Sequence, residues 1–66
     1  MILGEKLDKR PDGPLLAMAL GPGIDGWQFT KMERQTDGEV FIKKSRLRLG
    51  NRTESYEAEW YTEGQS

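Results

Sequence analysis

Two segments on either side of Gly50-Asn51 alternate between apolar and charged residues, and this alternation constrains the fold more than any other feature. Before the turn, Leu47 and Leu49 alternate with Arg46 and Arg48. After the turn, the apolar set of alternate residues is Tyr56, Ala58 and Trp60. The other set, on the opposite face, is Glu57, Glu59 and Tyr61. A period of two is typical of a half-buried β-strand. Pairing the segments as an antiparallel hairpin predicts leucines facing inward and an arginine row beside a glutamate row, each pair contributing roughly 0.2–1 kcal/mol.

A second hairpin is predicted around Asp37-Gly38. Residues 27–33 alternate large and polar side chains, and residues 40–42 are rich in strand formers. An Asp-Gly pair between strand-like segments is the strongest short-range hairpin signal. A three-residue loop with Gly38 in the left-handed conformation would place Trp27 opposite Leu47 and Met32 opposite Ile42. A bulge would shift this register, so these cross-strand pairs stay conditional.

The N-terminal third gives weaker signals. Residues 15–20 form an apolar run between Pro14 and the Gly21-Pro22-Gly23 breaker, which suits a strand or a short helix; its shortness favours a strand. Residues 1–13 are expected to form a short strand or a loose arm, with a turn at 11–13. The chain, residues 1–66, is therefore predicted to be a single all-β domain. Its expected architecture is an antiparallel meander of three or four strands, either an open sheet or a small SH3-like barrel.

The size of the chain limits how stable it can be alone. It has 66 residues and no cysteine, so no disulfide supplements the core. Domains this small bury only about 60% of the surface that the unfolded chain exposes. Their cores rarely supply more than about 3–5 kcal/mol, so association with a second copy would add needed stability.

Enzymatic and cofactor functions find little support in the residue types present. Without histidine or cysteine, acid–base chemistry would depend on carboxylates, lysines and tyrosines, and nothing pairs them convincingly. Gly21 to Gly26 matches G-x-G-x-x-G, but the following residues are strand-like, whereas a dinucleotide site needs a helix to begin there. We therefore predict no enzyme activity, no cofactor and no metal, and a loop between two strands at 21–26.

Charge is distributed in blocks along the chain. Residues 31–52 hold seven basic and three acidic residues, whereas residues 53–66 hold four glutamates and no basic residue. Small β-sheet domains bind single-stranded nucleic acids with aromatic rings and cations. A nucleic-acid-binding regulator is the alternative hypothesis, and its candidate residues are Lys43, Lys44, Arg46, Arg48, Trp27 and Phe29. A net charge of −1 weighs against it, as does the expected pairing of arginines with glutamates.

The leading hypothesis is a non-enzymatic protein-interaction or accessory module that associates with itself or another protein through a sheet face or edge. One small sheet has two faces, and the chain has enough apolar residues to cover only one well. The candidate interface residues are Met32, Val40, Phe41 and Tyr61. The longest apolar run, residues 15–20, is far shorter than a membrane span of about 20 residues. No secretory signal follows Met1, so a cytoplasmic location and a native N-terminus are expected.

Overall fold

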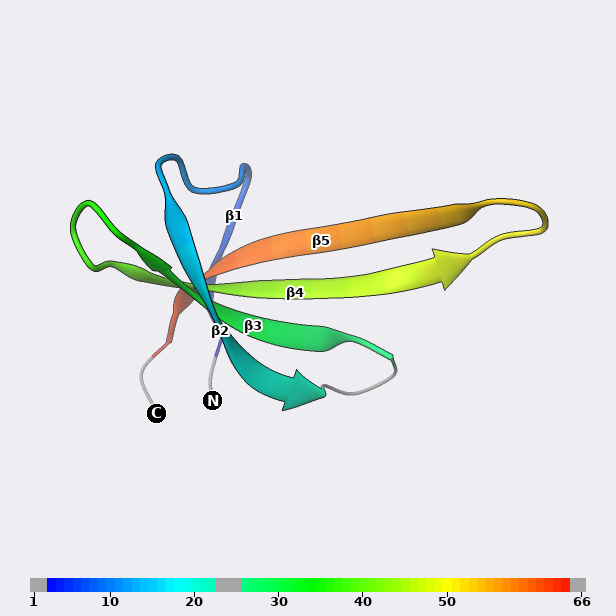
Figure 1. Cartoon of the computed structure of the whole chain (residues 1–66), viewed down its shortest axis with the longest axis horizontal. Coiled ribbons are helices and arrows are strands. Elements are labelled where there is room, and N and C mark those ends of the chain that lie inside the picture. Colours follow the sequence, from blue (N-terminus) through cyan, green and yellow to red (C-terminus); the bar gives the residue numbers. More distant parts are fainter. Residues whose placement is uncertain (1–2, 23–25, 65–66) are drawn as a thin grey trace.

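The computed structural model describes residues 3–22 and 26–64, which form one open antiparallel sheet of five strands in the order β1-β5-β4-β3-β2 (Figure 1). The described residues contain no helix. The prediction of a small all-β antiparallel sheet is confirmed, with five strands in place of three or four. The strands are β1 (Leu3–Leu7), β2 (Leu15–Pro22), β3 (Gln28–Arg34), β4 (Val40–Leu49) and β5 (Glu54–Glu63).

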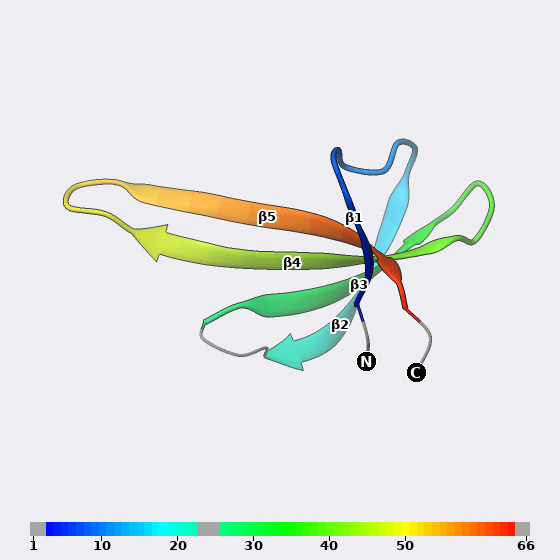
Figure 2. The ribbon, with the colours of Figure 1, turned by 180° about the vertical axis from the view of Figure 1, so that it is seen from behind.

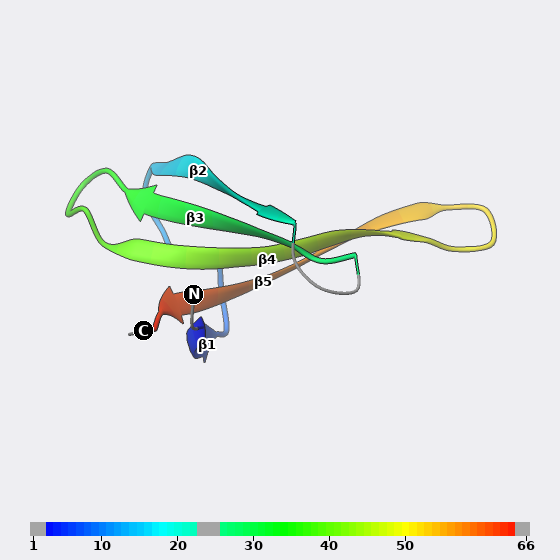
Figure 3. The same ribbon diagram turned by 90° about the horizontal axis from the view of Figure 1, so that it is seen from below.

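The N-terminal residues supply both edges of the sheet. Residues 3–7 form β1, which pairs with β5, so they form a strand and not a loose arm. The apolar run at 15–20 belongs to β2, as predicted, and β2 pairs with β3. Figure 3 shows β1 and β2 on opposite sides of the stacked strands. Residues 8–14, called the strap below, must therefore cross from one edge of the sheet to the other.

Gly4 allows β1 to lie tightly against β5. A Cβ atom on Gly4 would lie 2.7 Å from the carbonyl oxygen of Thr62, closer than real side chains approach. The N–H of Glu5 donates a hydrogen bond to Thr62 Oγ1 over 2.8 Å. The register of β1 on β5 shifts between Leu3 and Lys6, as at a β-bulge.

The β3–β4 register differs by one residue from the predicted one. Met32 lies opposite Phe41, and Gln28 lies opposite Ser45. The N–H of Arg34 donates to the carbonyl of Glu39, so the loop between them has four residues, 35–38, and not three. Gly38 does have the predicted positive φ, 74°. A slip of one residue exchanges the two faces of a strand, so Trp27 is not opposite Leu47 and Met32 is not opposite Ile42.

The core is divided between the two faces of the sheet. The strap face carries Phe41 and Trp60, which are 5% and 9% exposed, and the strap crosses it. The open face carries Ile42, which is fully buried. Register places Ile42 between Lys31 and Tyr61. Lys31 reaches across β4 to Glu63, with Nζ 2.9 Å from the carboxylate, and its stem therefore helps to cover the open face.

The β4–β5 hairpin projects beyond the rest of the sheet (Figure 2). The register confirms the predicted hairpin, with Arg46 opposite Glu57 and Leu47 opposite Tyr56. The prediction that the leucines face inward is wrong, because Leu47 and Leu49 are 60% and 73% exposed. Pairing of β3 with β4 stops at Ser45 and pairing of β1 with β5 stops at Trp60, so beyond these residues no further described strand pairs beside the two-stranded ribbon.

Candidate interaction surfaces

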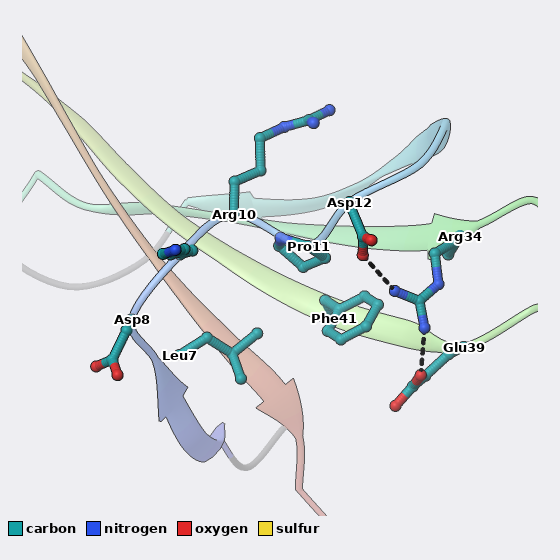
Figure 4. A pocket seen from close by; sticks show the side chains of 9 residues that line it. Leu7, Asp8, Arg10, Pro11, Asp12, Arg34, Glu39 and Phe41 are labelled. Carbon is teal, nitrogen blue, oxygen red and sulfur yellow. Dashed lines mark hydrogen bonds and ion pairs between the residues drawn. The ribbon is translucent and has the colours of Figure 1, made fainter.

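The strap closes one end of the sheet over Phe41 (Figure 4). Pro11, in the middle of the strap, is buried. The Arg10 guanidinium lies 5.7 Å from the centre of the Trp60 ring. Between strap and sheet lies an open groove of about 630 Å³, lined by Leu7, Asp8, Lys9, Arg10, Pro11, Asp12, Arg34, Glu39 and Phe41.

Arg34 ties the strap and the β3–β4 loop to the sheet. Its guanidinium binds Asp37 through two hydrogen bonds of 2.8 and 3.0 Å, and it contacts Glu39 at 2.7 Å and Asp12 at 3.3 Å. It also lies 5.2 Å from the centre of the Phe41 ring. The hydrogen bonds from Arg34 lower the pKa of Asp37 to about 2. Because Arg34 already engages three carboxylates and an aromatic ring, its role is to hold the fold together.

The open face brings together most of the residues predicted to bind nucleic acid. Trp27 stacks against two cations, with Lys44 at 4.5 Å and Arg46 at 4.3 Å from its ring centre. Phe29 lies opposite Lys44 on the same face. Lys43 does not join them, because it lies on the strap face, 5.1 Å from the ring centre of Tyr56 and 5.6 Å from that of Trp60.

The cations of the open face are paired with carboxylates. Glu57 accepts hydrogen bonds from Arg46 at 2.9 Å and Arg48 at 3.3 Å, and these bonds lower its pKa. Glu59 contacts Lys6 at 3.2 Å and Lys44 at 3.6 Å, and hydrogen bonding to Lys6 lowers its pKa most. This pairing reduces the positive potential that a phosphate backbone would meet.

The residues predicted as a protein interface do not form one patch. Phe41 is buried beneath the strap, so it offers no exposed ring. Met32 lies opposite Phe41, on the strap face, and is only partly exposed. Val40 and Tyr61 lie on the open face, each partly exposed.

The exposed apolar side chains lie elsewhere, and the sequence interpretation missed their exposure. Leu47, Leu49 and Tyr56, called the hairpin patch below, lie on the strap face of the projecting ribbon, and Tyr56 is 60% exposed. No local signal indicates this exposure, because Leu47 and Leu49 alternate with arginines as the residues of a half-buried strand do.

The free edge of β2 is a second exposed apolar feature. β2 is the last strand of the sheet, and it contains no charged residue. Leu16 is 51% exposed, and Ala17 is exposed as well. The predicted loop at 21–26 is flanked by β2 and β3, with positive φ at Gly21 and Gly26; its residues 23–25 lie outside the described part of the chain.

In residues 3–22 and 26–64, no helix is long and apolar enough to cross a membrane, and no cluster of three or more acidic side chains is arranged to hold a metal ion. No protein-family model matches the chain, and no curated protein or solved structure shows significant similarity to it.

Proposed function

We propose that this chain is a non-enzymatic protein-interaction or accessory module that associates with itself through a face or an edge of its sheet. The observation that carries the proposal is the imbalance between buried and exposed apolar side chains. Among the described residues the buried core is Phe41, Ile42 and Trp60. Among the side chains that the structure describes, the large exposed apolar ones are Leu16, Leu47, Leu49 and Tyr56.

The energetics favour covering these side chains with another protein surface. Burying a leucine side chain completely contributes roughly 1.5–3 kcal/mol. That contribution is large beside the few kcal/mol that a core of this size supplies on its own. An apolar patch on a small sheet is the usual mark of a protein interface, and association would stabilise the folded chain by mass action.

The test is the molar mass of the chain in solution as a function of concentration. We expect sedimentation equilibrium to give a mass that rises from 7.5 kDa toward twice that value as concentration increases from about 10 µM to about 1 mM. High salt should not abolish the association, because the exposed patches are apolar. A chain that stays monomeric throughout this range would contradict the proposal.

Nucleic-acid binding is the second candidate, and one observation favours it: Trp27 and Phe29 share the open face with Lys44, Arg46 and Arg48. Phosphate binding would require Arg46 and Arg48 to leave Glu57, at a cost to the affinity. We therefore expect no strong binding of a single-stranded oligonucleotide in a shift assay at low salt.

The variant Arg46→Ala/Arg48→Ala serves as the control for this assay. Phosphate contacts make affinity fall steeply as salt rises. If the parent chain bound the oligonucleotide with a strong salt dependence and the double variant did not, the open face would be a nucleic-acid interface and this candidate would replace the first.

A further inference from the structure

We infer that two copies of this chain pair along their β2 edges, antiparallel about a two-fold axis, so that one continuous sheet runs through both. This inference rests on the proposed self-association and names the surface that carries it. A strand at the edge of a sheet presents alternate N–H and C=O groups with no partner strand, and these groups are a template for another strand.

The sequence of β2 bounds the segment that can pair. Pro14 precedes the strand and Pro22 ends it, and proline has no N–H to donate to a neighbouring strand. Between them, residues 15–21 keep every backbone donor. This stretch contains only leucine, alanine, methionine and glycine.

The opposite edge of the sheet lacks these properties. β1 has only five residues, contains Gly4, carries the charges of Glu5 and Lys6, and has an irregular register. Charges and bulges are the features by which natural proteins block pairing at an edge. β2 carries no charge, and its own register irregularity, between Ala19 and Pro22, lies at its end, so residues 15–19 form a regular, uncharged edge.

Pairing of β2 with itself also suits the symmetry of a closed dimer. In a two-fold antiparallel pair, each strand meets a copy of itself, so a charge near the axis would lie close to its own copy. β2 has no charge to repel its copy. Pairing of β1 with β2 of another copy would instead leave further edges free and extend into an open chain of molecules.

The experiment compares two leucine-to-lysine variants in sedimentation equilibrium. Leu16, on β2, lies opposite Glu33, so the ammonium introduced by Leu16→Lys would face a carboxylate and the isolated chain should fold normally. With the two-fold axis at Ala17, the middle of the regularly paired residues 15–19, the two ammonium-bearing residues would be diagonal neighbours across the joined edge, roughly 7–8 Å apart. We expect at least about a tenfold weaker association, because like charges near each other across paired strands are destabilising.

Leu47→Lys is the matched control, since Leu47 is similarly exposed but lies in the hairpin patch. We expect Leu47→Lys to weaken association less than Leu16→Lys does, and circular dichroism should show both variants folded. If Leu47→Lys abolishes association and Leu16→Lys does not, the inference that the copies pair along β2 is overturned, while the proposed self-association stands. A parent chain that is monomeric overturns both.

Hydrogen exchange provides a second readout that does not depend on a variant. Pairing of the edges would give the outward-pointing amides among residues 15–18 a hydrogen-bond partner. We expect their exchange to slow as the parent chain associates with rising concentration. Association without any slowing at these amides would overturn the inference.

Discussion

Replacing Ile42 by alanine is expected to leave most of the chain unfolded. Ile42 is the largest side chain with no exposure among the described residues, and it lies between Lys31 and Tyr61 on the open face. Truncating a buried isoleucine costs about 2–5 kcal/mol, through lost burial and the cavity that remains. That loss is comparable with the roughly 3–5 kcal/mol that a core of this size supplies.

Urea unfolding followed by circular dichroism at one fixed protein concentration measures the effect, since association would shift the midpoint. Leu49→Ala is the control, because Leu49 is 73% exposed and its truncation should change the free energy of unfolding by less than about 0.5 kcal/mol. An unfolding midpoint of Ile42→Ala equal to that of the parent would contradict the core described above.

Replacing Arg34 by methionine is expected to release the strap and lower the melting temperature by at least about 5 °C. The substitution keeps an apolar stem near Phe41 but removes the contacts with Asp12, Asp37 and Glu39. Their carboxylates would then lie near one another without a cation, and the strap would lose its ion pair with the sheet. The matched control is Arg48→Met, because Arg48 is more exposed and contacts Glu57 alone.

The titration of Asp37 tests whether Arg34 binds Asp37 directly, apart from any general loss of stability in the variant. In the parent, NMR should show the Asp37 carboxyl titrating with a pKa of about 2, below its usual 3.8. In Arg34→Met, its pKa should rise toward 3.8, because the hydrogen bonds from Arg34 are the largest cause of the shift. A pKa that stays near 2 in the variant would show that Arg34 does not hold Asp37.

Because the pKa of Asp37 is lowered in the folded chain, the free energy of unfolding should depend on pH and should fall as pH falls. A carboxyl whose pKa is lower in the folded state contributes stability that is complete above its unfolded pKa. Asp37 should therefore contribute fully above pH about 4, and its contribution should be lost as pH falls toward 2. Glu57 and Glu59 act in the same direction, since hydrogen bonds to basic side chains lower their pKa values also.

The predicted β3–β4 register is wrong by one residue. A local signal can therefore place a turn correctly while the predicted register assigns side chains to the wrong faces of the sheet. Asp37-Gly38 correctly indicated the hairpin, and Gly38 has the expected positive φ. The length of the loop depends on where the backbones of Arg34 and Glu39 pair, and the side chains of the same two residues form an ion pair there. The one-residue shift places Trp27 on the face of Arg46 and not on that of Leu47.

The sequence by itself determined the strands of the two hairpins, their alternation and the placing of an arginine row beside a glutamate row, because a period of two and a turn residue are local properties of the chain. Only the tertiary structure decided which apolar residues are covered. Burial depends on how far neighbouring strands extend and on where the strap crosses, and these are contacts between distant segments. The sequence predicts that Leu47 faces inward and that Phe41 belongs to an interface, yet Leu47 is exposed on the ribbon and Phe41 lies in the core.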